Sequence, residues 1–334
     1  MTKHIVDKNK VTSQLRLIME VYMLKKSLKL SSFLLFLPLL LNCGGGGTEE
    51  KKTTTDAYQI EWNNLSDTTS LPTGVEFYSA KIEGTGGSVH YLKLDLINDA
   101  LELRAISVPQ SQNLNEFVKE TGAIAAINGG YFSGNTSYSA VIDNFNYFAR
   151  NVTSLNRNSK AYPVLRSGLT VSADNTAEVN WIYQFDQSGE VYKFEAPLAY
   201  ATDDSTPLPV PEKDDGTAFM PKLVIGGGPT LVKDGLENLS YAEEVFWGSG
   251  VFLNDLRPRT AVCVTADQHL IMLVATHYKI SALPKFLISI GCENAMNLDG
   301  GGSSAMATFD TEIYNQNRAV PSALVIVDKN TYAQ

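Results

Sequence analysis

The feature that most constrains this chain is a run of three glycines that follows a strand-like segment and a single carboxylate. Residues 294–298 fit a buried strand, and they continue into a carboxylate, the glycines and two hydroxyls: Asp299, Gly300, Gly301, Gly302, Ser303 and Ser304. Consecutive N–H groups in a glycine turn form a concave site for anions. Because three ordered glycines cost much conformational entropy, the run predicts a ligand-binding loop rather than a purely structural turn.

Two other apolar segments also end in glycine loops. Residues 123–127 lead into Asn128, Gly129, Gly130, Tyr131 and Phe132, and residues 223–225 lead into Gly226, Gly227, Gly228 and Pro229. Asn can hold a sugar hydroxyl or water and aromatic rings can stack on a sugar, although a strand-end turn with two core aromatics fits the first loop equally well. Asp234 and Gly235 predict a hairpin turn rather than a catalytic acid.

A pair of arginines precedes the strand-like segment 260–265. The planar guanidinium fork suits phosphate or carboxylate; Arg259, next to Thr260, is the better candidate, whereas Arg257 fits a surface ion pair. Gly300, Gly302 and Ala305 also match the loose dinucleotide pattern G-x-G-x-x-A. Too few residues follow them to complete a doubly wound nucleotide domain, and the P-loop pattern does not occur.

Composition supports a globular chain and excludes some partners. The 334 residues are 44% hydrophobic and carry a formal net charge of -9, which disfavours a nucleic-acid binder. Four His and three Cys are too few for a zinc cluster or a disulfide-rich framework. The expected fold class is α/β in the mixed α+β sense, with mixed β-sheets, short flanking helices and one domain over residues 75–330.

Periodicity predicts two units of the order strand, strand, helix, strand. In the first, residues 89–96 and 101–107 alternate and fit a hairpin, and Asn113 caps a helix that Gly122 ends. In the second, residues 260–265 and 270–276 fit a hairpin, and Ser281 caps a helix that Gly291 ends. The shared order suggests an internal pseudo-repeat. Between the units, residues 169–171, 178–185 and 190–194 fit strands, and residues 201–217 an exposed loop.

The N-terminal region predicts export. Lys25, Lys26 and Lys29 precede an apolar run over residues 30–41 that is too short to span a bilayer. Residues 1–42 therefore fit a signal region, with Met23 as a candidate true start. Cys43 fits the lipidated residue of a bacterial lipoprotein, followed by a flexible tether and lead-in over residues 43–74. The expected location is a bacterial membrane, at its periplasmic or cell-surface face. The alternative is a plain signal peptide with an incidental Cys.

Four segments in register resemble the phosphodiester glycosidase family. They are residues 126–132, 227–235, 258–262 and 297–304, and the resemblance covers about residues 75–328. It implies a single phosphodiester-glycosidase-like domain that hydrolyses a sugar-1-phosphodiester between the anomeric carbon and oxygen, releasing a sugar and a phosphomonoester. Cys263 stands where the family usually has Gly. Cys263 and Cys292 could form a disulfide, and buried free thiols fit equally well.

The residues fit that chemistry in distinct roles. Asp299 would act as base, nucleophile or electrostatic partner beside an oxocarbenium-like centre, while Arg259 and the amides of residues 300–304 would hold the phosphate charge. Asn128 would orient sugar or water, and Tyr131 or Phe132 would stack on the sugar. The remaining substrate-binding candidates are Gly129, Gly130, Gly227, Gly228, Pro229, Thr260, Gly300, Gly301, Gly302, Ser303 and Ser304.

Other readings of the same residues stay open. No cofactor is required, although Asp and Asn oxygens could hold a divalent cation. The expected partners are a phosphorylated glycan or sugar phosphodiester and, through the anchor, a membrane. A non-catalytic surface binder of phosphorylated glycans and a phosphodiesterase that cuts P–O are the alternatives. All these functions require the three glycine loops to lie together in space.

Overall fold

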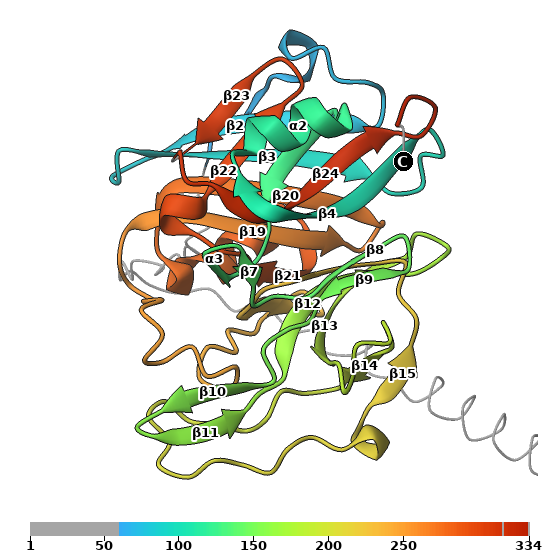
Figure 1. Ribbon diagram of the computed structural model, residues 1–334. Coiled ribbons are helices and arrows are strands. Elements are labelled where there is room, and N and C mark those ends of the chain that lie inside the picture. The colour runs from blue at the N-terminus through green and yellow to red at the C-terminus, as the bar shows by residue number, and fades with distance from the viewer. Residues whose placement is uncertain (1–59, 316, 333–334) are drawn as a thin grey trace, which may run out of the picture. The chain divides into compact units, whose positions relative to one another are not determined.

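The computed structural model describes residues 60–315 and 317–332, which belong to the compact unit Asp56–Gln334. The predicted signal region, Cys43 and most of the predicted tether lie outside the described residues. Sheets and short helices are both present, as expected, but sheets dominate (Figure 1). Every strand pair in residues 60–332 is antiparallel, so the expectation of mixed sheets is wrong on that point.

The largest sheet has eight strands and contains the strand that leads to Asp299. Its order is β1-β2-β3-β20-β19-β21-β17-β18. The strands are β1 (Asn63–Asn64), β2 (Val75–Ile82), β3 (Gly87–Asp95), β20 (His269–Tyr278), β19 (Arg257–Thr265), β21 (Cys292–Asn297), β17 (Thr230–Lys233) and β18 (Leu236–Glu237). Packing already includes residues before Val75, since Trp62 stacks edge-on against Tyr91.

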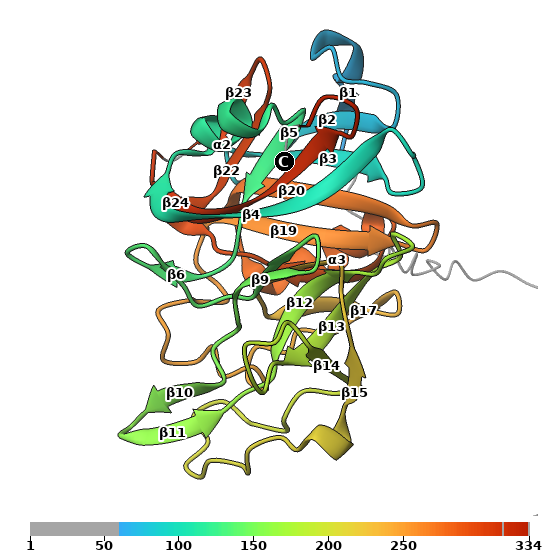
Figure 2. The same cartoon turned by 45° about the vertical axis from the view of Figure 1, so that its right-hand side comes forward.

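Two further sheets complete the architecture (Figure 2). The five-stranded sheet has the order β23 (Glu312–Asn315), β22 (Ala305–Thr308), β5 (Ala125–Asn128), β24 (Val320–Asp328), β4 (Leu101–Gln112). The seven-stranded sheet has the order β15 (Thr217–Phe219), β14 (Val191–Phe194), β13 (Ala177–Tyr183), β12 (Arg166–Val171), β16 (Leu223–Gly226), β8 (Val141–Asp143), β9 (Asn146–Ala149). Two small hairpins are β6 (Phe132–Ser133) with β7 (Thr136–Ser137), and β10 (Ser154–Arg157) with β11 (Lys160–Pro163).

One apolar core joins all three sheets. Leu92, Leu169 and Leu324, from three different sheets, are fully buried in the same cluster. Helix α2 (Leu114–Thr121) packs with β5, β22 and β24 of the five-stranded sheet, and α3 (Leu283–Ser289) packs with β17, β18 and β21 of the eight-stranded sheet. Short 3₁₀ turns are η1 (Ser66–Thr68), η2 (Lys213–Asp215), η3 (Ile280–Ala282) and η4 (Gly301–Ser303). No helix in this part of the chain is long and apolar enough to cross a membrane.

The predicted hairpin over residues 89–107 is wrong, although both of its strands exist. β3 pairs with β2 and β20, whereas β4 pairs with β24 in another sheet. Alternation shows that one face of a strand is buried, but it does not identify the neighbouring strand. The predicted order of strand, strand, helix and strand is present in both units, but the likeness does not extend to strand pairing, because β19 pairs with β20 whereas β3 does not pair with β4.

The helix boundaries are partly as predicted. Asn113 caps α2, its N–H donating to Glu116 at 2.8 Å, and Gly122 ends the helix with a φ of +63°. Ser281 does not cap α3, because η3 precedes the helix and Ser281 Oγ instead donates to Asn254 at 2.7 Å. The predicted middle strands correspond to β12, β13 and β14.

A disulfide joins Cys263 in β19 to Cys292 in β21, which settles the alternative that the sequence left open. The two residues are 29 apart in sequence, so the bond closes a loop of ordinary size.

We expect the double variant Cys263→Ala/Cys292→Ala to lose roughly 2–4 kcal/mol of unfolding free energy. Urea denaturation with and without a reductant checks this. The reductant should lower the midpoint of the parent protein and leave that of the double variant unchanged; equal midpoints in all four conditions would contradict the prediction.

Candidate active site

The three glycine loops lie together in space. The Asp299 N–H donates to Gly129 O at 3.3 Å, and the Gly228 N–H donates to Asn297 O at 2.8 Å. The Tyr131 hydroxyl donates to Gly228 O at 2.8 Å and accepts from Asn297 Nδ2 at 2.9 Å. Loops that follow β5, β16 and β21, one from each sheet, therefore form a single hydrogen-bonded cluster.

Close packing between the loops explains why the loops after β5 and β16 contain glycine, since a larger residue would not fit there. A Cβ on Gly130 would lie 2.2 Å from Gly226 O, and one on Gly227 would lie 2.5 Å from Asn297 O. Either contact would force the loops apart. The third loop differs, because a Cβ on Gly301 would meet nothing within 4 Å, and the residue has a φ of +60°. Only this loop presents its glycine backbone to open space.

Asp299 follows the buried residues of β21 and Leu298, and its side chain is partly exposed. One carboxylate oxygen accepts the Gly300 N–H at 2.9 Å, and Ser303 also hydrogen-bonds the carboxylate. Burial raises the pKa of Asp299 above its usual value, while Ser303, the positive charge of Arg318 and the Gly300 amide partly oppose that rise. Desolvation therefore dominates the pKa of the Asp299 carboxyl group, although the residue as a whole keeps some exposure.

Arg318 is a cation that the sequence motifs did not single out as a site residue. Its Nη1 donates to Ser303 Oγ at 3.0 Å, and its guanidinium lies 4.6 Å from the centre of the Phe132 ring. Arg318 is exposed, whereas Ser303 is buried. The hydrogen bonds from Arg318 to Ser303 and from Ser303 to Asp299 therefore place positive charge beside the carboxylate. The Phe132 ring lies against the Arg318 guanidinium.

The Asn128 side chain joins the first glycine loop to the third loop and to β19 through hydrogen bonds. Its side chain is fully buried; Nδ2 donates to Asp299 O at 2.8 Å, and Oδ1 accepts from Thr260 Oγ1 at 2.8 Å and from the Ala305 N–H at 3.1 Å. Thr260 Oγ1 also lies 3.0 Å from the buried Ser304 Oγ, within hydrogen-bonding distance. In this geometry Asn128, Thr260 and Ser304 position Asp299, and they do not face an open cavity as the expected contact with sugar or water would require.

Arg259 lies beneath the third loop but is engaged by protein groups. It is 4% exposed, its Nε donates to Tyr278 O at 3.0 Å, and its Nη2 pairs with Asp255. Burial lowers its pKa, and Asp255 opposes that change. Asp255 also pairs with Arg257, which fits the predicted surface ion pair. Much of the phosphate-binding capacity predicted for Arg259 is therefore directed to Asp255 and backbone carbonyls.

A cavity of about 260 Å³ opens beside the first two loops, and we call it the Arg166 cavity. Tyr131, Phe132 and Gly227 contribute to its wall, as predicted substrate-binding residues would. Arg157, Arg166 and Phe246 also line it, and no sequence motif indicated any of the three. The available signal for Arg166 was an arginine directly after the apolar residues Val164 and Leu165, at the first position of β12.

Tyr131 connects this cavity to Asp299. Burial raises the pKa of its hydroxyl, the negative charge of Asp299 adds to the rise, and the positive charge of Arg166 opposes it. Asp299 itself is not part of the cavity wall. The other predicted glycines, together with Pro229, Ser303 and Ser304, belong to the same loop cluster, so the structure brings the predicted residues together.

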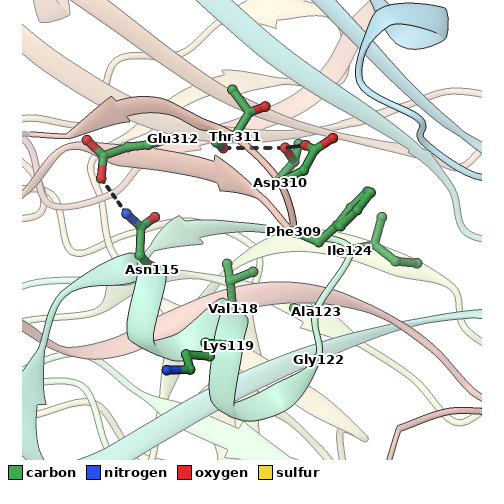
Figure 3. Close-up of a pocket in the computed structure, with 11 residues that line it drawn as sticks. Asn115, Val118, Lys119, Gly122, Ala123, Ile124, Phe309, Asp310, Thr311 and Glu312 are labelled. Carbon is green, nitrogen blue, oxygen red and sulfur yellow. Dashed lines mark hydrogen bonds between the residues drawn. The ribbon is translucent and has the colours of Figure 1, made fainter.

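A hollow of about 560 Å³ lies between α2 and the turn joining β22 to β23 (Figure 3). Two pairs of its polar groups already bond to one another, since Asn115 donates to Glu312 and Thr308 donates to Asp310 at 2.8 Å. Within residues 60–332 as described, no group of three or more His, Cys, Asp or Glu side chains gathers in a way that could hold a metal ion.

The fold and the loop cluster define an antiparallel-sheet domain with one carboxylate at a glycine-lined site. The chain belongs to the phosphodiester glycosidase family, whose model matches residues 121–327. No curated protein matches it by sequence.

Two solved structures show the same fold. One is a hypothetical protein from Synechocystis, at a TM-score of 0.53 and 16% identity over 81% of this chain and 64% of that one. The other is the zebrafish N-acetylglucosamine-1-phosphodiester alpha-N-acetylglucosaminidase catalytic domain, auto-inhibited by its pro-peptide, at a TM-score of 0.53 and 17% identity over 81% of this chain and 88% of that domain. Because this chain spans less than two thirds of the Synechocystis protein and identity is low, these likenesses carry the fold alone.

Proposed function

We propose that the protein hydrolyses a sugar-1-phosphodiester, breaking the bond between the anomeric carbon and the bridging oxygen. The observation that carries this proposal is the convergence of three glycine loops on Asp299, with Arg318 and Ser303 beside the carboxylate. Family membership supports the reaction class, and the zebrafish relative is by name a phosphodiester glycosidase.

The chemistry needs charge stabilisation more than proton donation. When the anomeric C–O bond breaks, its electron pair leaves with the phosphate, which is a weakly basic group. Water supplies the oxygen that bonds to the anomeric carbon and loses a proton to Asp299 or to solvent. Ionised Asp299 stabilises the oxocarbenium-like centre, as carboxylates do in other glycosidases. The positive charge of Arg318 favours the ionised form of Asp299 that this role requires. No second catalytic acid is required for so good a leaving group.

The proposed setting is outside the cytoplasm, on a glycan or glycoconjugate. The Cys263–Cys292 disulfide supports it, since disulfides persist mainly in oxidising compartments. The signal region over residues 1–42, lipidation at Cys43 and attachment to a bacterial membrane remain proposals from the sequence, as does a single domain over residues 75–330.

Hydrolysis in ¹⁸O-labelled water tests the proposed bond cleavage. With a sugar-1-phosphodiester substrate, we expect the label in the released sugar, because water attacks carbon. Mass spectrometry of both products locates it. Label in the phosphomonoester would instead establish cleavage of P–O. Binding without turnover would support the non-catalytic binder of phosphorylated glycans.

A further inference from the structure

Arg166 is a buried cation that has no hydrogen-bond or ion-pair partner for its guanidinium among the residues that the structure describes. Arg166 is 6% exposed, and none of its guanidinium nitrogens donates a hydrogen bond to a described residue. Its Nε is fully enclosed and unpartnered, and the guanidinium carbon lies 3.8 Å from the centre of the Phe246 ring. Arginine carries five N–H donors, so this burial leaves a large hydrogen-bonding demand unmet.

A second cation strengthens the positive field of the same cavity. Arg157 donates only to neutral carbonyls, those of Trp247 at 2.6 Å, Val245 at 3.1 Å and Asn156 at 2.9 Å. No carboxylate among residues 60–315 and 317–332 lies within 4.0 Å of either arginine. Burial is the main cause that lowers the pKa of Arg166, and the nearby charge of Arg157 lowers it further. The pKa of Arg166 is about 10.

The carboxylate whose charge acts on Arg166 is Glu244, and it forms no ion pair with either arginine. Glu244 is fully buried and raises the pKa of Arg166, but its oxygens accept hydrogen bonds from other groups. Ser167 donates through its N–H at 2.9 Å and its hydroxyl at 2.6 Å, and the Thr230 N–H donates at 2.8 Å. The arginine N–H groups therefore remain available on the cavity side.

We propose that the Arg166 cavity binds the phosphate group of the substrate through Arg166 and Arg157, with the linked aglycone against the apolar wall. That wall includes Val152, Leu155 and Val251. A cavity of about 260 Å³ is below the usual size of a complete ligand site, so it accommodates a phosphate with a small adjoining group rather than a whole glycan. The sugar then lies over Tyr131 towards Asp299. The assignment to substrate rests on the proposed function, but the anion site itself does not.

Inorganic phosphate is the probe, and Arg166→Met is the main variant. Calorimetric titration should show phosphate binding to the parent protein, weakening as salt rises, and a Kd raised roughly tenfold or more in Arg166→Met. The melting temperature of each variant is measured first without phosphate, because Arg166→Met also removes the positive charge that acts on buried Glu244. Arg150→Met, at an exposed position, is the matched control and should bind as the parent does. Arg166→Lys keeps the charge but lacks the fork, and should bind with intermediate affinity.

Several outcomes separate this inference from the proposed function. Parent-like phosphate affinity in Arg166→Met would overturn the inference, as would a loss of binding seen in Arg318→Met but not at Arg166. Should Arg166→Met fail to fold, parent-like affinity in Arg166→Lys would overturn it instead. Phosphate binding that depends on Arg166, in a protein that turns over no sugar phosphodiester, would uphold the anion site and defeat the proposed function.

Discussion

Asp299→Asn is expected to abolish most turnover while leaving substrate binding in place. The amide keeps the shape of the side chain but cannot take a proton or stabilise positive charge at the anomeric carbon. We expect kcat to fall by roughly 10²–10⁴-fold. Steady-state kinetics with a sugar-1-phosphodiester, together with calorimetric affinity for a non-hydrolysed analogue, measure the two effects. A drop in affinity equal to the drop in turnover would argue against a catalytic role.

The pH profile gives a second measure of the same group. Burial raises the pKa of Asp299, so kcat/KM of the parent should fall on the acid side at a pH above the value of about 4 typical of a carboxyl group. At a pH between the ordinary and the raised pKa, Asp299 is protonated in the folded chain but ionised in the unfolded chain. Raising the pH through this window therefore lowers the free energy of unfolding. Asp299→Asn should therefore be at least as stable as the parent at neutral pH.

Asp234→Asn is the matched control for this variant. Asp234 lies in the exposed turn between β17 and β18, as the sequence predicts, with a φ of +52° that Asn also tolerates. Activity and stability should match those of the parent. Turnover within about twofold of the parent in Asp299→Asn would remove Asp299 from the mechanism.

Glu244→Ala is expected to cause the largest loss of stability. Besides its bonds to Ser167 and Thr230, Glu244 accepts from Ser240 Oγ at 2.5 Å and from Trp181 Nε1 at 3.2 Å. Removing the carboxylate leaves these buried donors without an acceptor, and it removes the negative charge that acts on Arg166. We expect a loss of roughly 3–5 kcal/mol in the free energy of unfolding, measured by urea denaturation.

The neighbouring Glu243→Ala provides the control for Glu244. The Glu243 side chain is partly exposed and forms no hydrogen bond or ion pair with a described residue, so its removal should change stability by less than about 0.5 kcal/mol. Similar denaturation midpoints for both variants would mean that the Glu244 hydrogen bonds contribute little. Glu244→Gln should fall between them, because one of its two polar atoms becomes a donor facing donors.

Local signals predicted local structure well. The cap at Asn113, the stop at Gly122 and the turn at Asp234 each depend on a few adjacent residues, and all are confirmed. The partner of β4 was missed because it lies more than 200 residues away in β24, and alternation carries no information about that distance. Strand existence is therefore readable from this sequence, whereas strand order is not.

The candidate site divides in the same way. The glycine runs after apolar segments correctly indicated three loops, each of which follows a strand of a different sheet. The prediction that these loops lie together is confirmed by the hydrogen bonds that join them. Whether an arginine is free depends on residues remote in sequence. Arg259, the expected phosphate ligand, is held by Asp255, while Arg166 has no such partner. Identifying the unpaired cation required the folded arrangement.

The hydroxyl of Tyr131, fixed between Gly228 and Asn297, has a consequence for how a substrate is received. The surrounding framework is assembled before any ligand arrives, so little chain entropy remains to be lost on association. Contacts with the incoming molecule can then favour distortion towards the transition state instead of ordering the protein.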